Sequence, residues 1–505
     1  MKVALVNPPW SRPGHYGVRA GSRWPHFEEN GSRYMPFPFY LGYAASLLEN
    51  DGFEAAVFDG CATKERDDAF LRRVAAFAPD IVIQENATAS IGIDLKWAET
   101  LHSTTGARLL MTGHHVGFMQ DDLGKYPFLD ALGGGEWDYT ALEYCQRVRD
   151  GRELAGTLGL SHRGPDGRAV HEPRRPNIPN LDVLPFPHRR TLDMGLYHDN
   201  PGDIPHPSLQ LHGSRGCPYK CDFCVWPQVV YEDNKYRTRS AKNMADEIET
   251  VFRRESYPYR SYYFDDDTFN IGDKRLADFA DELISRGLEH IPWGAMCRAD
   301  TLKKDTLAKL RKAGLAAVKY GVESGNQKIV DDSGKKLDLT VLRDMMAFTH
   351  SLGIRTHLTF SFGLIGETRE SMEQTLDLAL ELDPYTVQFS ISTPFPGTRF
   401  YDYASRKGLL LTTDYSAYDG MSRSVVRADA VSAQELEDYL VHAYATWRRH
   451  AARRRGGVVR RVLGDPLGSA KLALRNPRRA FHYAMGALTS GARSPGGQGD
   501  RTHAA

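Results

Sequence analysis

The chain has 505 residues, and its 64 Lys plus Arg balance 64 Asp plus Glu, so the formal net charge is zero. This length predicts two or three domains, and a neutral chain lacks the basic charge typical of proteins that bind nucleic acids. No apolar run reaches the length of about 18 residues that a membrane span needs, and the first residues lack a signal-peptide layout. We therefore expect neither a nucleic-acid partner nor a transmembrane segment.

Residues 1–150 alternate between apolar strand patterns and amphipathic helix patterns. Such alternation is typical of a Rossmann-like, doubly wound α/β domain, in which helices cover both faces of a parallel sheet. Ligands bind these sheets beyond the carboxyl ends of the strands. Strands are expected at 3–6, 54–58, 80–83, 108–111 and, more weakly, 128–132, with helices at 39–49 and 91–101. The loops expected at the carboxyl ends are 7–9, 87–90, 113–114 and 133–136.

Residues 151–204 are rich in Pro, Arg and Gly, which predicts a connector. Residues 205–425 then alternate between strand and helix again. Six strands are expected, at 208–211, 261–264, 293–296, 317–320, 356–362 and 386–391, with helices among them at 244–253, 276–285, 307–313 and 342–352. In a barrel of βα units the chemistry lies in the loops that follow the strands.

The C-terminal extension, residues 426–505, is expected to be helical, then basic, and disordered from about Gly491 onward. Eleven Lys or Arg and one acid, Asp465, lie between Arg448 and Arg479. The favoured interpretation is a solvated helix pair that covers the barrel. The alternative is contact with an anionic lipid surface or a phosphorylated substrate.

Three of the six cysteines lie in one short loop, with the spacing Cys217-x3-Cys221-x2-Cys224. Three such thiolates can hold three irons of a [4Fe–4S] cube, and no fourth cysteine follows at matching spacing, so one iron should stay open. A zinc site more often uses paired C-x2-C units, and disulfides across such short gaps would be strained. The remaining cysteines (Cys61, Cys145 and Cys297) are scattered, unlike a secreted disulfide framework, and are expected to be buried apolar residues.

This loop resembles the signature of the radical SAM superfamily, and the six-strand pattern matches the partial (β/α)6 TIM-type barrel of that superfamily. The resemblance implies that the three cysteines ligate the cluster and that S-adenosylmethionine (SAM) binds the open iron. It places Phe223 near the adenine, with ordinary loop packing as the alternative. An oxygen-sensitive cluster and the absence of an export signal imply a cytoplasmic location.

The same resemblance assigns SAM contacts to residues that end later strands. Three consecutive carboxylates lie where the family binds the SAM amino group, although they also fit a metal site or a solvated turn. Glu323 and Ser324 match positions that bind the SAM ribose and carboxylate, and Arg298 matches a position that holds the SAM carboxylate or faces the substrate. Gly363 with Gly366-Glu367 resembles a glycine-rich element of the family. The SAM candidates are Phe223, Asp265, Asp266, Asp267, Arg298, Glu323, Ser324 and Gly363.

The N-terminal domain resembles the cobalamin-binding domain of one large class of radical SAM enzymes, on the motifs VNPP, PFPFYLGYAASLLENDGFE, IDLKWAETLH, TGHH and GGGEWD. An Asp-x-His-x-x-Gly motif is missing, which fits the absence of a histidine below the cobalt in this class. The alternative is a Rossmann-like domain that binds no ligand, in which His114 and His115 make only local hydrogen bonds. The cobalamin candidates are Asn7, Pro8, Thr88, Ser90, Gly113, His114, Gly134, Gly135 and Glu136.

These resemblances identify the chain as a cobalamin-dependent radical SAM enzyme, most consistent with a methyltransferase that acts on an unactivated carbon of a small metabolite in secondary metabolism. They imply that a 5′-deoxyadenosyl radical removes a hydrogen atom, that methylcobalamin supplies the methyl group, and that a flavodoxin or ferredoxin donates the electron. The alternatives are a radical cyclase or rearrangement enzyme and, from another class, a cobalamin or redox carrier without turnover. The sequence leaves the substrate open, with anionic and lipid-linked small molecules among the candidates.

Overall fold

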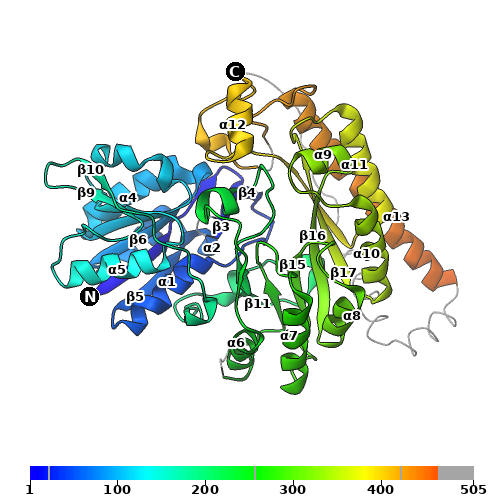
Figure 1. Ribbon diagram of the computed structural model, residues 1–505, viewed down its shortest axis with the longest axis horizontal. Helices are drawn as coiled ribbons and strands as arrows, with labels where there is room; N and C mark the ends of the chain where they lie inside the picture. The colour runs from blue at the N-terminus through cyan, green and yellow to red at the C-terminus, as the bar shows by residue number, and fades with distance from the viewer. Residues whose placement is uncertain (21–22, 255–256, 421–422, 465–505) are drawn as a thin grey trace. The chain divides into compact units, whose positions relative to one another are not determined.

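The N-terminal part of the chain forms a seven-stranded sheet in the order β10-β9-β8-β7-β6-β1-β5 (Figure 1). The structure is a computed structural model that describes residues 1–464 apart from 21–22, 255–256 and 421–422. Five strands of this sheet are parallel, whereas β9 and β10 are antiparallel. The strands are β1 (Lys2–Asn7), β5 (Glu54–Asp59), β6 (Ile81–Asn86), β7 (Arg108–Gly113), β8 (Ala131–Gly133), β9 (Leu160–Arg163) and β10 (Ala169–His171).

Helices cover both faces of this sheet, which confirms the doubly wound arrangement. On one face α1 and α5 bury Leu41 and Tyr144 against residues such as Leu5 of β1. On the other face α3 and α4 bury Phe70 and Trp97 in a second core. The parallel strands are apolar on both sides, as two-sided burial requires. The helices of this part are α1 (Phe39–Asn50), α2 (Gly60–Thr63), α3 (Asp67–Phe77), α4 (Ile91–Thr105) and α5 (Asp138–Arg149).

A three-stranded antiparallel sheet between β1 and α1 was not expected from the sequence. It consists of β2 (Ser11–Arg12), β3 (His15–Ala20) and β4 (Arg23–Glu29). Arg19 of β3 is fully buried and its Nη1 lies 2.6 and 2.8 Å from the two carboxylate oxygens of Asp94 on α4. The backbone carbonyl of Arg19 also accepts a hydrogen bond from Asn7 at 3.1 Å. These contacts fix the small sheet at the carboxyl ends of β1 and β6.

The N-terminal sheet extends further along the chain than the expected boundary near residue 150, through two antiparallel strands. Strands β9 and β10 lie within the predicted connector, and β9 pairs with β8. Their pattern escaped prediction because the strands are short and carry polar residues such as His162 and His171. The rest of the segment, up to residue 204, contains no strand among the elements described.

The second sheet has six strands in the order β11-β14-β15-β16-β17-β18, all parallel. This confirms the six βα units predicted for the partial barrel. The strands are β11 (Ser208–Leu211), β14 (Ser261–Phe264), β15 (Trp293–Cys297), β16 (Leu315–Glu323), β17 (Arg355–Phe362) and β18 (Thr386–Ile391). The helices among and after them are α6 (Ala241–Arg254), α7 (Asp273–Ser285), α8 (Lys304–Lys312), α9 (Gln327–Asp332), α10 (Leu339–Ser351), α11 (Arg369–Leu382) and α12 (Arg399–Arg406).

The final helix, α13 (Ala433–Gly464), begins in the unit formed by Met1–Leu440 and continues into a second unit that starts at Val441. Its presence agrees with the helical C-terminal extension expected from the sequence. The predicted disordered tail lies outside the described residues, because residues 465–505 are not described, and the predicted basic segment is described only as far as residue 464. Among the helices that the structure describes, none combines the length and the apolar character that crossing a bilayer requires.

Candidate functional site

The three clustered cysteines lie in the loop that follows β11, at the carboxyl end of the first barrel strand. All three are free and partly exposed. The side-chain amide of Gln228, on the π-helical turn η7 (Trp226–Val230), donates to the carbonyls of Cys221, Asp222 and Cys224 at 3.1, 3.0 and 2.8 Å. Its Oε1 accepts from the backbone N–H of Arg399 at 2.9 Å. Gln228, which the sequence analysis missed, therefore holds the cysteine backbone in one conformation.

Two of the three consecutive aspartates reach back to this loop. Asp266 accepts from the backbone N–H of Gly213 at 3.0 Å and from the Ser214 hydroxyl. Asp267 accepts from the backbone N–H of Gly216 at 3.0 Å. Burial raises the pKa of Asp266 to about 6. The geometry gives these two carboxylates a role in holding the segment before Cys217, whereas Asp265 is buried at the end of β14.

The loop passes very close to neighbouring backbone. Gly216 has a φ of +88°, and a Cβ at this position would lie 2.2 Å from the carbonyl oxygen of Lys235. Gly334 has a φ of +72°, and its Cβ would lie 2.3 Å from the carbonyl oxygen of Lys220. Both positions need glycine, because no L side chain fits there at this conformation.

Glu323 ends β16 and forms an ion pair with Lys335, whose Nζ lies 2.9 Å from Glu323 Oε1. Lys335 is 8% exposed. Burial raises the pKa of the Cys221 thiol to about 11, and the charge of Lys335 opposes this shift. Glu323 has a φ of +73° at an irregularity between β16 and β17. A Cβ at Gly321 would lie 2.8 Å from Glu323 Oε1 and 3.0 Å from Lys335 Nζ, so the glycine leaves space beside this pair.

The other SAM candidates make mainly structural contacts. Arg298 stacks on the Tyr219 ring with 3.8 Å from Cζ to the centroid and pairs with Asp300. The Ser324 hydroxyl accepts from the backbone N–H of Asn326 at 3.1 Å, at the turn before α9. Phe223 is half-buried against a small apolar cluster that includes Phe400 of α12. Gly363 has a φ of +86° and donates its N–H to Glu367 at 3.2 Å.

The buried Glu367 predicts a pH-dependent stability. Burial raises its pKa from 4.5 to about 7, so the folded protein holds this proton more tightly than the unfolded chain does. The contribution of this group to stability is therefore present below pH 4.5 and is lost as the pH rises through about 7. Relative to Glu367→Gln, the wild type should lose on the order of 2–3 kcal/mol of unfolding free energy between pH 5 and pH 8.

Urea unfolding of both proteins at the two pH values measures this difference. Glu370→Gln, at an exposed site three residues further along in the first turn of α11, is the matched control and should follow the wild type. An equal pH dependence in the wild type and in Glu367→Gln would contradict the prediction.

A cavity of about 420 Å³ lies between the carboxyl edge of the N-terminal sheet and the segment after the cysteines. This volume is within the range of roughly 300–1,000 Å³ typical of small-molecule and cofactor sites. Four of the predicted cobalamin residues line it: Gly113, His114, Gly134 and Gly135. The barrel side contributes Gln228, Val229, Val230 and Gly397. The residue that anchors the cysteine loop therefore also faces this cavity.

Glycine is required at the wall of this cavity. Gly113 has a φ of +110°, and a Cβ there would lie 2.3 Å from the carbonyl oxygen of Asn86. The connector also contributes to the lining, through Ser161, His171 and Arg174. Their contribution was not foreseen, because the strands that carry Ser161 and His171 were not predicted and Arg174 lies just beyond the second of them.

The two adjacent histidines are joined through Thr88. The backbone N–H of Thr88 donates to His114 Nε2 at 3.0 Å, and the Thr88 hydroxyl lies 2.9 Å from the same nitrogen. His115 Nδ1 lies 3.1 Å from that hydroxyl. Burial lowers the pKa of His115 to about 4, so it is neutral at pH 7. His114 Nε2 accepts an amide proton, so its lone pair faces Thr88.

The remaining cobalamin candidates are not among the residues that line the cavity. Asn7 donates to Asp59 at 2.9 Å, and the Pro8 carbonyl accepts from Arg19 at 3.1 Å. Ser90 donates to Asp94 at 2.7 Å. These three hold the small antiparallel sheet in place. Glu136 is buried and pairs with Arg237 of the barrel at 2.7 Å.

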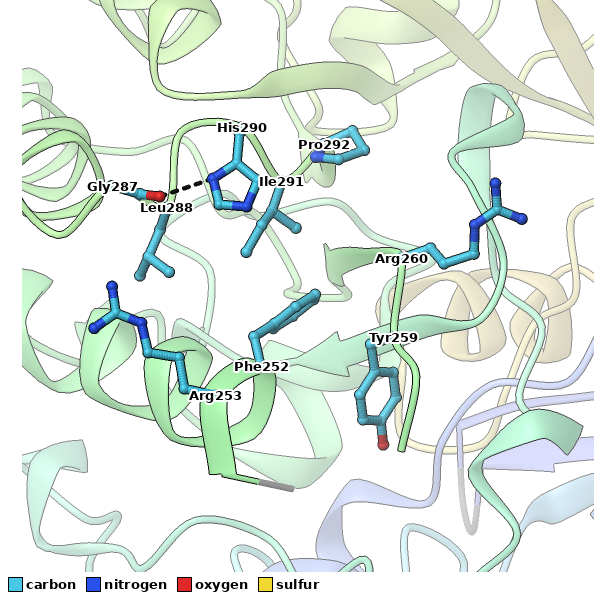
Figure 2. A pocket seen from close by; sticks show the side chains of 9 residues that line it. All are labelled: Phe252, Arg253, Tyr259, Arg260, Gly287, Leu288, His290, Ile291 and Pro292. Carbon is cyan, nitrogen blue, oxygen red and sulfur yellow. Dashed lines mark hydrogen bonds between the residues drawn. The ribbon is translucent and has the colours of Figure 1, made fainter. Parts of the chain in front are cut away.

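A smaller pocket of about 280 Å³ lies at the opposite end of the barrel strands (Figure 2). Its lining includes Arg260 and Pro292, which directly precede β14 and β15. The cysteines follow the carboxyl end of β11, so this pocket is separate from the site described above.

In the described part of the chain no three His, Cys, Asp or Glu side chains converge on one metal ion. A [4Fe–4S] cluster does not require three ligands around one metal ion, because each cysteine thiolate binds a different iron.

Residues 211–379 match the Radical SAM superfamily. An uncharacterized methyltransferase of Pyrococcus horikoshii, PH0819, is 29% identical over 413 residues, which cover 81% of this chain and 87% of that protein. An anaerobic magnesium-protoporphyrin IX monomethyl ester cyclase of Rubrivivax gelatinosus is 27% identical and is aligned over 88% of this chain and 77% of its own length.

The fold is also similar to a solved structure. The radical S-adenosylmethionine methyltransferase TsrM from Kitasatospora setae, with tryptophan and a SAM analog bound, superposes with a TM-score of 0.63 at 18% identity. The superposition covers 82% of this chain and 77% of that one.

Proposed function

We propose that this chain, which carries a radical SAM domain over residues 211–379, is a cobalamin-dependent radical SAM C-methyltransferase that acts on an unactivated carbon of a small molecule. One observation carries the proposal. Gln228 lines the cavity between the two sheets and also donates to the carbonyls of Cys221 and Cys224. A cofactor in the cavity would therefore lie beside the loop that binds the cluster.

We assign Cys217, Cys221 and Cys224 to the cluster and the space beside Glu323 and Lys335 to SAM. The donor set fits these groups, because thiolates bind iron and a buried carboxylate–ammonium pair suits an amino acid with both charges. Gly321 leaves room at this pair. When bound, the cluster and SAM supply hydrogen abstraction and cobalamin supplies methyl transfer. The protein contributes orientation and exclusion of water.

The cavity lining favours cobalamin bound without a histidine ligand to cobalt. Two of the described histidines line the cavity. His114 Nε2 accepts from the Thr88 N–H, and the two ring nitrogens of His171 each lie 3.0 Å from another side chain, Ser161 Oγ and Asp121 Oδ1. Gly113, Gly134 and Gly135 allow close approach of a flat macrocycle to the backbone.

We propose four parts of the chain: a cobalamin-binding domain at 1–150, a connector at 151–204, a radical SAM core at 205–425 and a C-terminal extension at 426–505. Strands β9 and β10 of the connector are added to the sheet of the first domain.

The electron paramagnetic resonance spectrum of protein loaded with cob(II)alamin tests this arrangement. We expect no nitrogen superhyperfine splitting from an axial ligand. The His114→Ala variant should give the same spectrum as the wild type, because His114 Nε2 is turned toward Thr88. Nitrogen splitting that disappears in His114→Ala would contradict the prediction, as would nitrogen splitting from the cobalamin base.

Product mass tests the reaction class. Reconstituted enzyme with SAM, methylcobalamin and reductant should convert its substrate to a product that is heavier by one methylene, with formation of 5′-deoxyadenosine. A cyclase or rearrangement enzyme is the second candidate, because a relative aligned over 88% of this chain is named as a cyclase. An unchanged or dehydrogenated product mass would favour that candidate, and absence of 5′-deoxyadenosine would refute both.

Several partner assignments belong to the same proposal. The cluster needs a low-potential electron, which we assign to a flavodoxin or ferredoxin. We propose a cytoplasmic location and a small-molecule substrate, with anionic and lipid-linked molecules as the candidate classes. The basic segment between Arg448 and Arg479 is the feature that would recruit an anionic substrate, with a solvated covering helix as the favoured alternative.

A further inference from the structure

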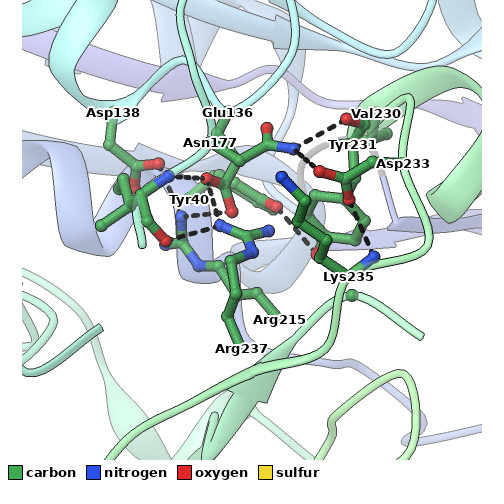
Figure 3. A network of polar contacts seen from close by, with 12 residues as sticks. Tyr40, Glu136, Asp138, Asn177, Arg215, Val230, Tyr231, Asp233, Lys235 and Arg237 are labelled. Carbon is green, nitrogen blue, oxygen red and sulfur yellow. Dashed lines mark hydrogen bonds and ion pairs between the residues drawn. The ribbon is translucent and has the colours of Figure 1, made fainter. Parts of the chain in front are cut away.

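A buried ionic network connects the two candidate cofactor sites (Figure 3). Arg215 follows Ser214 in β12 (Ser214–Arg215), two residues before Cys217. Its guanidinium is 2% exposed and binds both carboxylate oxygens of Asp138, at 2.7 and 3.0 Å. Asp138 is the first residue of α5 in the N-terminal sheet domain. The contact therefore joins the cluster segment to a different domain.

A second ion pair reinforces the first. Glu136 lies 2.7 Å from Arg237 and 3.6 Å from Arg215, and it accepts the backbone N–H of Ile178 at 2.8 Å. Arg237 begins β13 (Arg237–Thr238) and lies directly opposite Arg215 in that two-stranded sheet. Two facing arginines would repel each other, so the two carboxylates of the N-terminal domain are needed to hold β12 and β13 together.

Two aromatic side chains of α1 also pack against the network. The Arg215 guanidinium lies over the rings of Tyr40 and Tyr43 of α1, at 4.7 and 5.0 Å from their centroids. Charged groups buried in such surroundings cannot exchange partners for water without a large cost. The arrangement is therefore rigid, and a displacement of Glu136 or Asp138 must also displace Arg215.

Each end of the network is adjacent to a cofactor position. Glu136 directly follows Gly134 and Gly135, which line the cavity assigned to cobalamin. Arg215 precedes Gly216, which is held by Asp267 and by close backbone contact with Lys235, and then Cys217. Ordering of the glycine loop by a bound corrin would thus order the first cysteine, and a bound cluster would order the glycine loop.

We infer that Arg215, Asp138, Glu136 and Arg237 are positioning residues that make cobalamin binding and cluster binding mutually favourable. This inference rests on the proposed function, since it takes both cofactors from it. By linkage, the factor by which the cluster tightens cobalamin binding equals the factor by which cobalamin tightens cluster binding. Couplings of this kind are typically about 5- to 150-fold.

The test measures the dissociation constant of hydroxocobalamin for the full chain with and without its cluster. We expect the wild type to bind cobalamin at least about tenfold more tightly when the cluster is present. In Asp138→Asn the ratio should fall to less than about threefold, because the amide offers Arg215 one neutral acceptor in place of two charged ones and leaves only the longer ion pair, to Glu136. Glu143→Gln, which removes two partly exposed ion pairs (to Arg147 and Arg175) from the same helix, is the matched control and should keep the wild-type ratio.

A second measurement needs no variant and covers the case in which Asp138→Asn fails to fold. The rate at which a chelator removes iron from the wild type should fall at least about fivefold when hydroxocobalamin is bound. Equal cobalamin affinities with and without the cluster, or an unchanged ratio in folded Asp138→Asn, would overturn the inference alone. A wild type that binds neither cofactor would overturn the proposed function and this inference with it.

Discussion

Replacing Cys217, Cys221 and Cys224 together by alanine should reduce the iron content of the reconstituted protein from about four atoms per chain to about zero. Each cysteine supplies one thiolate, and the partly exposed loop offers no other cysteine in the described residues. Iron analysis and the visible absorption of the anaerobically reconstituted protein measure the loss.

The matched control is the triple alanine variant of the other cysteines, Cys61, Cys145 and Cys297. The structure confirms that all three are buried and free, with the Cys61 thiol 3.2 Å from the Pro8 carbonyl. This variant should keep the cluster if it folds, since none of these thiols lies in the loop. Four irons in the Cys217, Cys221 and Cys224 variant would refute the cluster assignment.

Replacing Lys335 by methionine should raise the dissociation constant of SAM by about 10- to 100-fold in cluster-loaded protein, since hydrogen bonds to charged groups contribute roughly 1.5–3 kcal/mol. Lys335 is buried beside Glu323, and its charge acts on Cys221. Methionine keeps much of the side-chain volume while it removes the charge that the SAM carboxylate would meet.

Equilibrium dialysis with labelled SAM measures this change, and the iron content shows whether the cluster is intact. Lys336→Met is the matched control, because Lys336 is the adjacent residue and is exposed. It should bind SAM like the wild type. Unchanged affinity in Lys335→Met, or an equal loss in both variants, would remove Lys335 from the SAM site.

The parallel sheets were predictable because their strands are buried on both faces. Runs such as Val3-Ala4-Leu5-Val6 and Ser261-Tyr262-Tyr263-Phe264 are entirely buried, and this burial makes them apolar in the sequence. The small sheet β2–β4 gave no such signal. Its strands contain His15, Arg19 and Glu28, and their stability depends on contacts such as Arg19 with Asp94, 75 residues away.

The cysteine loop was predictable from spacing alone, whereas the surrounding side chains were not. Asp265, Asp266 and Asp267 are equivalent in the sequence, yet only the structure shows that two of them bind the backbone of the cysteine segment. Lys335 and Gln228 carry no local signal, since one lies in a turn after α9 and the other four residues beyond Cys224. Their roles depend on contacts between distant segments, to Glu323 and to the cysteine carbonyls.

The first strand of the barrel lies at the edge of its sheet, and the remainder of the chain covers it. Gln210 of β11 accepts the backbone N–H of Phe37 at 2.7 Å, and its own carbonyl accepts from Arg189 at 3.4 Å. An uncovered edge strand tends to pair with other chains. The six-stranded barrel is therefore not an autonomous module in this protein. A fragment that begins at residue 205 would expose β11 and should aggregate, so domain-swapped chimaeras must carry residues 34–37 and the connector along with the barrel.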